Sequence, residues 1–284
     1  MEIDKNVKLR ILTPKDMQKQ EVSMKKSIEF ESNDNKIHGK FYYTEGEPPF
    51  PTVLLLSGFP GNEDDVLGLG QKMIQHGINI LTFNYRGIYK SEGTFSLQNT
   101  YEDIQAANEY LHQEEVIRKF KVDTDKLILG GYSYGGGMAL AYAAKYPGFK
   151  RIFAIGGTDH GEFAREYKRN PLFSEMIDAI FEELKSPAGP VRFEGKAAIE
   201  ELTQNPTPYD LRINATALAN RDILLIGGWD DTNATIEHHI LPFYRTLVNT
   251  NAQKVQITAF QDDHEFEKSR EELAATIIRW IKSP

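Results

Sequence analysis

The sequence predicts an α/β fold in which a mostly parallel, doubly wound sheet carries helices on both faces. Short apolar runs typical of buried strands alternate along the chain with segments of helical periodicity. Several of these runs are continuously apolar, as expected for strands that are covered on both faces. At 284 residues, the chain is long enough to bury a core of this size.

The expected elements follow one another in a regular order. Strands are predicted over residues 27–31, 37–44, 52–57, 78–83, 126–131, 151–155, 223–226 and 255–260. Helices are predicted over residues 62–76, 101–111, 134–146 and 235–249, and over a closing segment that contains 273–280. The acids at 63–65 are expected to complement the N-terminus of the first of these helices.

Residues 158–221 interrupt this alternation. Apolar side chains recur there at helical spacing up to Leu184, and four prolines punctuate the rest of the segment. The segment is too long for a simple connection between a strand and a helix. We therefore expect a helical cap, inserted over the carboxyl edge of the sheet, between two core segments at 26–157 and 222–284; a helical elaboration packed elsewhere is the alternative. Residues 1–25 are expected to form an N-terminal extension.

Composition excludes several classes of function. The chain contains no cysteine, so disulfides, thiolate metal sites and cysteine nucleophiles are excluded. Its formal net charge of −8, without a basic stripe, disfavours nucleic acids and anionic membranes as partners. We expect a small-molecule substrate, and the sequence leaves the oligomeric state open.

The N-terminal segment is charged throughout and has no apolar core, so it is expected to be neither a signal peptide nor a membrane anchor. No apolar run is long enough to cross a bilayer. The expected location is the cytoplasm, or the exterior for a protein whose signal peptide has been removed.

The most informative motif is Gly-Tyr-Ser-Tyr-Gly at residues 131–135. It follows an apolar run and precedes an alanine-rich segment, so it is expected to join a strand to a helix. Such a turn holds its serine, here Ser133, in a strained backbone conformation, and the flanking glycines remove side chains that would collide. The hydroxyl of Ser133 is thereby expected at the carboxyl end of the sheet.

Together with four other motifs in the same order, this turn makes the chain resemble the α/β-hydrolase superfamily from about residue 37 to its end. Ser-Gly-Phe-Pro-Gly at 57–61 is similar to the oxyanion loop of that family, although the family often has histidine where Ser57 stands. The other segments that resemble family motifs are Asn-Tyr-Arg-Gly at 84–87, Gly-Trp-Asp-Asp at 228–231 and Asp-His-Glu-Phe at 263–266.

The resemblance implies a Ser-Asp-His order of catalytic residues, and the chemistry agrees with it. A serine hydroxyl needs a base, and an acid must orient the imidazole that serves as this base. Of the seven histidines, His264 alone lies between the expected last strand and the closing helix. The family places the acid three residues after the last glycine, Gly228, which selects Asp231; counting from Gly227 would select Asp230.

The resemblance also implies an oxyanion hole made of two backbone amides, those of Phe59 and Tyr134. Other residues are candidates for substrate contact or for packing, namely Tyr132, Asp159, His160, Phe173, Met176 and Phe181. Adjacent histidines at 238–239 diverge by about 100° on a helix, and no HExxH spacing occurs, so we expect neither a metal nor another cofactor.

The sequence therefore predicts a serine hydrolase that cleaves a carboxylic ester, thioester or amide of a small molecule through an acyl-enzyme. A peptidase of the same fold is an alternative within the enzymes. A ligand-binding protein that keeps the fold without turnover is an alternative from another class.

Overall fold

The computed structural model describes residues 24–47 and 49–283, which form an eight-stranded sheet with helices on both faces. The expected N-terminal extension lies almost wholly outside this range. The strands are β1 (Lys25–Ser32), β2 (Asn35–Tyr42), β3 (Phe50–Leu56), β4 (Asn79–Phe83), β5 (Val122–Tyr132), β6 (Arg151–Ile155), β7 (Asp222–Gly228) and β8 (Lys254–Phe260). All eight strands expected from the sequence are present, which confirms the predicted fold class.

The order of strands across the sheet is β1-β2-β4-β3-β5-β6-β7-β8. The pairs β1–β2 and β2–β4 are antiparallel, and every later pair is parallel. Because β5 lies between β3 and β6, the turn that follows β5 lies at the carboxyl edge in the middle of the parallel region. A site at the carboxyl ends of such strands receives loops from both sides.

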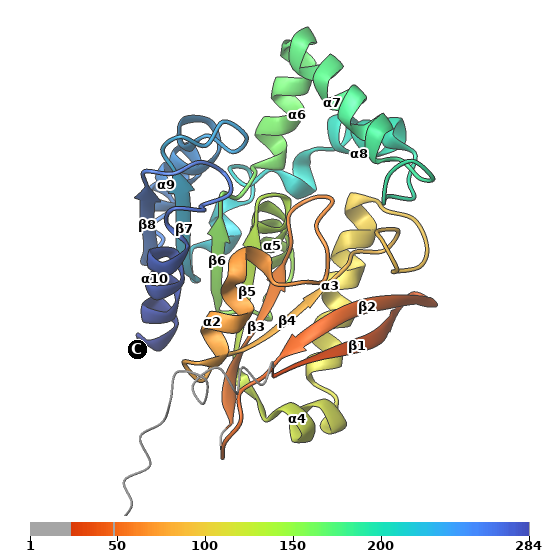
Figure 1. Cartoon of the computed structure of the whole chain (residues 1–284). Helices are drawn as coiled ribbons and strands as arrows, with labels where there is room; N and C mark the ends of the chain where they lie inside the picture. The colour runs from red at the N-terminus through yellow and green to blue at the C-terminus, as the bar shows by residue number, and fades with distance from the viewer. Residues whose placement is uncertain (1–23, 48, 284) are drawn as a thin grey trace, which may run out of the picture.

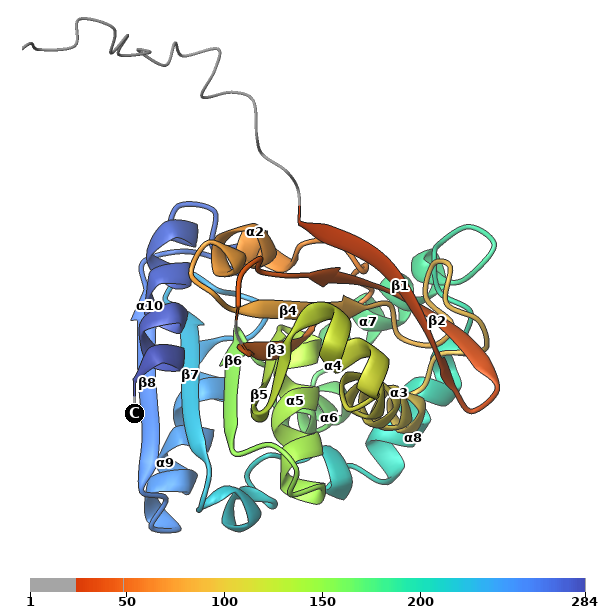
Figure 2. The same cartoon turned by 90° about the horizontal axis from the view of Figure 1, so that it is seen from below.

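The helices are α2 (Leu69–Ile74), α3 (Leu97–Leu111), α4 (Glu114–Phe120), α5 (Tyr134–Lys145), α6 (His160–Arg169), α7 (Pro171–Leu184), α8 (Gly195–Gln204), α9 (Leu241–Asn249) and α10 (Arg270–Lys282). Short helical turns add η1 (Val66–Gly68), η2 (Thr207–Tyr209), η3 (Ala215–Leu218) and the π-helical η4 (Ile236–Ile240). In Figure 2, α2 and α10 cover one face of the sheet, while α3, α5 and α9 cover the other.

Two apolar clusters fill the space between the sheet and these helices. One contains the core side chains of α3, α5 and α9, including Tyr101, Ile104 and Leu247. The other contains those of α2 and α10, including Met73 and Ile277. The helical spacing of apolar residues in the sequence thus corresponds to the faces that pack on the sheet.

The helix expected over residues 62–76 is shorter than predicted. Leu67 and Gly68 adopt positive φ angles of 53° and 73°, so a regular α-helix begins only at Leu69. Of the three acids expected to complement its N-terminus, Asp65 does so, because its carboxylate accepts hydrogen bonds from the amides of Gly70 and Gln71.

Residues 158–221 contain α6, α7 and α8. Figure 1 shows these helices beyond the carboxyl ends of the parallel strands, above the start of α5. The chain leaves the core after β6 and returns to it at β7, so the two ends of the insertion are anchored on neighbouring strands. We refer to these three helices as the cap.

Candidate active site

Ser133 stands between the end of β5 and the start of α5, with φ 55° and ψ −122°. The flanking glycines are needed for this turn. A Cβ at Gly131 would lie 2.2 Å from the carbonyl oxygen of Gly135, and a Cβ at Gly135 would lie 2.4 Å from that of Ser57. The strained backbone and the close packing together hold Ser133 at the carboxyl edge of the sheet.

The loop between β8 and α10 brings His264 to this serine. Its Nε2 lies 2.8 Å from Ser133 Oγ, and its Nδ1 lies 2.7 Å from Asp231 Oδ2. The three side chains come from the ends of β5, β7 and β8. This arrangement lets the imidazole accept the serine proton at one nitrogen while the carboxylate holds the other.

Asp231 is held in place by its own loop. Its Oδ1 accepts hydrogen bonds from the amides of Asn233 at 2.8 Å and Ala234 at 2.9 Å. Burial by itself would raise the pKa of Asp231, but the hydrogen bonds from His264 and from these amides outweigh it and hold the pKa below its ordinary value. The residue therefore stays a carboxylate beside His264.

Asp230, the alternative acid, lies outside this arrangement. Its side chain is exposed and accepts a hydrogen bond from Gln261 Nε2 at 2.8 Å. Of the two adjacent aspartates, the structure brings Asp231 to His264.

The loop after β3 lies beside the turn that carries Ser133. A Cβ at Gly58 would lie 3.3 Å from Ser133 Cβ, so this loop and the serine are in close contact. The next residue, Phe59, packs its ring 5.8 Å from that of Tyr134 and 5.7 Å from that of Phe181 in the cap. One side chain thus links the loop expected to supply an oxyanion donor to α5 and to the cap.

Ser57, at the position where the family often has histidine, is buried, and its hydroxyl has no hydrogen-bond partner among the residues that the structure describes. Its carbonyl oxygen accepts a hydrogen bond from Tyr85 Oη at 2.7 Å. Ser57 therefore holds this loop through the hydrogen bond to its backbone carbonyl and not through its side chain.

Tyr132 contacts the histidine loop directly. Its hydroxyl lies 3.1 Å from the carbonyl oxygen of His264 and 3.1 Å from Oε1 of Glu265. Its ring centre lies 5.1 Å from that of the His264 imidazole. The tyrosine before Ser133 thus connects the strand that carries the serine to the loop that carries the histidine.

Two cavities meet at Ser133. The inner cavity, about 270 Å³, lies under the cap and is lined mainly by apolar side chains, among them Phe163, Phe173, Met176, Ile177, Phe181 and Leu202. The outer cavity, about 560 Å³, is lined mainly by polar residues, among them Asn62, Asp64, Tyr132, His264, Glu265 and Arg270. Ser133, Phe59 and Asn233 line both.

The candidates for substrate contact divide between these cavities. Phe173, Met176 and Phe181 line the inner one, and Tyr132 lines the outer one. His160 also lines the inner cavity, and burial lowers its pKa from 6.5 to about 4.

Asp159 does not face either cavity. Its side chain is fully buried, caps α6 through the amide of Gly161 at 3.0 Å, and accepts a hydrogen bond from Arg212 Nε at 3.1 Å. This corrects the expectation of substrate contact. A carboxylate beside a strand end can serve a helix cap and an ion pair equally well, and sequence does not distinguish these roles.

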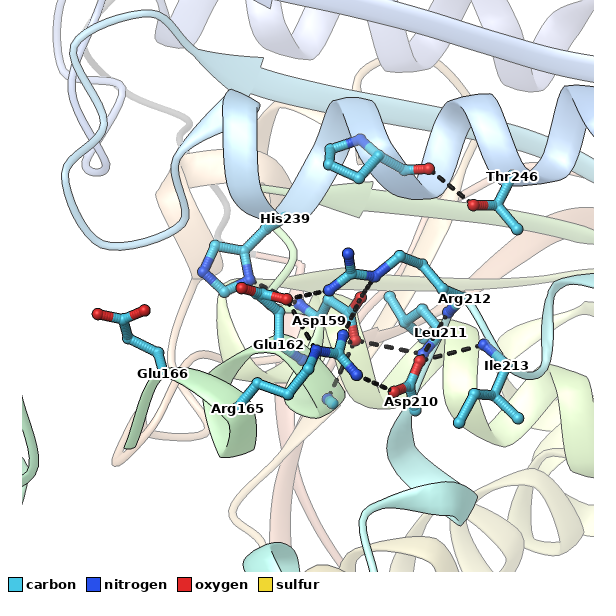
Figure 3. A network of polar contacts seen from close by, with 12 residues as sticks. Asp159, Glu162, Arg165, Glu166, Asp210, Leu211, Arg212, Ile213, His239 and Thr246 are labelled. Carbon is cyan, nitrogen blue, oxygen red and sulfur yellow. Dashed lines mark hydrogen bonds and ion pairs between the residues drawn. The ribbon is translucent and has the colours of Figure 1, made fainter. Parts of the chain in front are cut away.

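Asp159 belongs to a network of charged side chains that fixes the base of the cap (Figure 3). Arg212 also pairs with Glu162, and Arg165 pairs with both Glu162 and Asp210. The amide of Asp159 donates to Nδ1 of His239 in η4 at 3.2 Å. The network therefore ties α6 to the chain before β7 and to the helix that comes after the Asp231 loop.

Sequence reasoning missed part of the site. Thr232 and Asn233 line the inner cavity and directly follow Asp231, and Ala198, Ile199 and Leu202 line it from α8. The helical spacing of Ala198, Ile199 and Leu202 is the one sequence signal that could have predicted part of this lining. Within residues 24–47 and 49–283, no group of three or more metal-binding side chains is placed to hold a metal ion. No helix in the same range is long and apolar enough to span a membrane.

Comparison with known proteins identifies the family of the fold. A family model described as alpha/beta hydrolase fold matches residues 51–273. A proline iminopeptidase from Saccharolobus solfataricus is 31% identical over 164 residues, which cover 54% of this chain and 48% of that protein. Lipase 3 from a Moraxella species is 24% identical over 247 residues, covering 78% of this chain and 74% of the lipase. The chain thus spans about half of the iminopeptidase and about three quarters of the lipase.

Solved structures resemble the whole fold. An esterase from Pyrococcus furiosus superposes with a TM-score of 0.64 at 18% identity, covering 95% of this chain and 93% of the esterase. Est1E from Butyrivibrio proteoclasticus, solved with ferulic acid bound, gives a TM-score of 0.65 at 14% identity, covering 89% and 97% of the two chains. At such identities the likeness concerns the fold alone.

Proposed function

The chain belongs to the alpha/beta hydrolase family, and on this premise we propose that it is a serine hydrolase that cleaves carboxylic esters of small molecules through an acyl-enzyme. The observation that carries the proposal is the continuous contact from Ser133 Oγ through the His264 imidazole to Asp231. A serine hydroxyl, a base and an orienting carboxylate in this order are what acyl transfer requires.

The proposed reaction uses these groups in two stages. Ser133 Oγ attacks the ester carbonyl carbon while His264 Nε2 takes the hydroxyl proton, and the carbonyl oxygen becomes an oxyanion. The amides of Phe59 and Tyr134 are proposed to stabilise that charge. When the carbon–oxygen bond to the alcohol breaks, His264 returns the proton to the leaving alcohol, and the acyl group remains on Ser133.

Hydrolysis of the acyl-enzyme completes the cycle. A water molecule attacks the acyl carbon while His264 Nε2 takes one of its protons, and the same amides hold the second oxyanion. Collapse of this intermediate releases the carboxylic acid, and Ser133 regains its proton from His264. Asp231, kept ionised by its hydrogen bonds, stabilises the imidazolium in both stages.

An ester is proposed ahead of a peptide because of the extent of the matches. The lipase aligns over 78% of this chain, whereas the iminopeptidase aligns over 54%. Esters also have better leaving groups than amides, so a proficient site of this kind should be detected first with them.

Labelling with a fluorophosphonate tests the proposal. We expect stoichiometric modification of Ser133 in the native protein, loss of labelling after heat denaturation, and hydrolysis of simple aryl or alkyl esters by the unlabelled protein. Absence of both labelling and ester turnover would instead support the ligand-binding alternative. Faster turnover of aminoacyl amides than of esters would support the peptidase.

A further inference from the structure

The two cavities at Ser133 differ in the polarity of their lining residues, and this difference indicates which half of a substrate each cavity would hold. The inner cavity is walled mainly by apolar side chains from α6, α7 and α8, including Phe163, Phe173 and Leu202. The outer cavity presents carboxylates, amides and a guanidinium, including Asn62, Glu265 and Arg270. A substrate bound across Ser133 would place one of its halves in each.

The position of His264 decides which half lies where. In acyl transfer, the base that took the serine proton must return it to the leaving oxygen, so the leaving group lies on the histidine side of the reacting carbon. His264 lines the outer cavity and does not line the inner one. The alcohol half of an ester therefore belongs in the outer, polar cavity.

The acyl half then belongs under the cap. The inner cavity is lined by Ser133 and Tyr134 and by side chains of α7 and α8. Its volume of about 270 Å³ is just below the range of roughly 300–1,000 Å³ found for sites that hold a whole drug-sized ligand. A space of this size and lining is suited to the apolar part of a small substrate.

The outer cavity also restricts the charge of the alcohol. Its charged lining residues are Asp64, Asp65, Glu265 and Arg270, so carboxylates outnumber cations there. Asp64 is paired with Lys40, and Asp65 is occupied by the amides at the start of α2. The remaining surface offers hydrogen-bonding groups of both kinds but no surplus of positive charge for an anionic leaving group.

We propose that the substrates of this protein are esters of an apolar, short to medium-length acid with a hydrophilic alcohol that carries hydroxyl groups and no negative charge. The acyl chain occupies the inner cavity under the cap, and the alcohol occupies the outer cavity beside His264. This assignment rests on the proposed function, because the direction of the ester follows from the role of His264.

Two isomeric esters test the direction of binding. Glyceryl hexanoate and hexyl glycerate contain the same atoms, but the apolar chain is on the acid in the first and on the alcohol in the second. After division by the rate constants for hydroxide hydrolysis, we expect kcat/KM to be at least about tenfold higher for glyceryl hexanoate. Equal values, or a preference for hexyl glycerate, would overturn the proposal.

A pair of variants tests the location of the acyl chain. Met176 lines the inner cavity and is half-exposed, so tryptophan at this position is expected to fold and to fill part of the cavity. Met176→Trp should lower kcat/KM for glyceryl hexanoate at least about tenfold relative to glyceryl acetate. Leu172→Trp is the matched control, because Leu172 lies on the same helix, is 77% exposed and lines neither cavity.

Equal losses for the hexanoate and the acetate in Met176→Trp, or the same selectivity change in Leu172→Trp, would contradict the assignment of the inner cavity. Failure of the inference differs from failure of the proposed function. If simple esters are hydrolysed and Ser133 is labelled while neither glyceryl hexanoate nor hexyl glycerate reacts, only the inference fails. If neither labelling nor any ester turnover occurs, the proposed function fails.

Discussion

Nε2 of His264 lies 2.8 Å from Oγ of Ser133, although 131 positions separate the two residues in the sequence. The contact exists because β5 and β8 end at the same edge of the parallel sheet, with β6 and β7 between them. Asp231 completes it from the end of β7, at 2.7 Å from Nδ1 of the same imidazole. Three parallel strands thus bring a serine hydroxyl, an imidazole and a carboxylate into contact.

The two adjacent aspartates should respond very differently to conversion into amides. Asp231→Asn should lower kcat for ester hydrolysis by about 10⁴-fold, because an amide donor at this position favours the wrong imidazole tautomer. Asp230→Asn should change kcat less than about threefold, since the Asp230 side chain is exposed and its described hydrogen bond is to Gln261, away from His264. Full activity in both variants would show that another group orients His264.

Tyr132→Phe should lower kcat about three- to tenfold with little change in KM. The change removes a hydroxyl whose single proton lies between two acceptors, the His264 carbonyl oxygen and Glu265 Oε1, and one such hydrogen bond contributes about 1 kcal/mol. Steady-state kinetics on a hydrolysed ester measures the effect. Tyr244→Phe, on α9, is the control and should leave kcat unchanged. If the two variants behave alike, the hydroxyl of Tyr132 does not position the histidine loop.

Ser57→Ala should leave the free energy of unfolding unchanged or raise it by up to about 1 kcal/mol. The hydroxyl is buried without a partner among the described residues, so its removal relieves a desolvation cost and breaks no hydrogen bond. Urea unfolding provides the measurement. Ser91→Ala is the matched control, because the buried Ser91 hydroxyl bonds to His38 and Asn84 and its loss should cost about 1–3 kcal/mol. A comparable loss in Ser57→Ala would reveal a bond to that hydroxyl.

Stability should decrease as the pH falls from about 6.5 toward 4, partly because of His160. Its pKa is about 4 in the folded protein, against an ordinary value of 6.5 that applies to the unfolded chain, so between these values the unfolded chain binds more protons. The contribution of His160 to the free energy of unfolding is fully present above pH 6.5 and is lost as the pH falls toward 4. For a pKa shift of this size it amounts to roughly 3 kcal/mol.

His160→Gln should therefore reduce the slope of unfolding free energy against pH in this window. His112→Gln, at an exposed position, serves as the control and should keep the wild-type slope. Chemical denaturation at a series of pH values gives the slopes. An unchanged slope in His160→Gln would mean that the residue is not buried as a neutral imidazole.

Much of the fold could be predicted from the sequence, because buried parallel strands such as 52–57 leave continuous apolar runs and helices such as α3 leave a clear apolar spacing. The elbow around Ser133 is equally clear in the sequence, because Gly-x-Ser-x-Gly between an apolar run and a helical segment is a local pattern. The structure shows why both glycines are needed: Gly131 lies against Gly135 within the turn, and Gly135 lies against the carbonyl oxygens of Leu56 and Ser57 at the end of β3. The late start of α2 was not predictable, since nothing in the residue type signals the positive φ of Leu67.

Interactions between distant segments account for the rest. In the sequence, Asp159 is a polar residue that follows a strand at the carboxyl edge of the sheet. Its hydrogen-bond partner Arg212 lies 53 positions away, so the sequence does not show that Asp159 is buried at the base of the cap. The separation of an apolar from a polar cavity likewise depends on how α7 and α8 pack over Ser133. Such pairings are decided by tertiary structure and leave no local pattern.

The turnover number of purified Ser133→Ala tests the central claim most directly. Alanine removes only the proposed attacking oxygen, so the variant should keep the melting temperature of the wild type to within a few degrees. Its kcat for an ester that the wild type hydrolyses should fall by about 10⁴-fold or more. Turnover within about tenfold of the wild type, in a folded preparation free of other esterases, would contradict the assignment of Ser133 as the nucleophile.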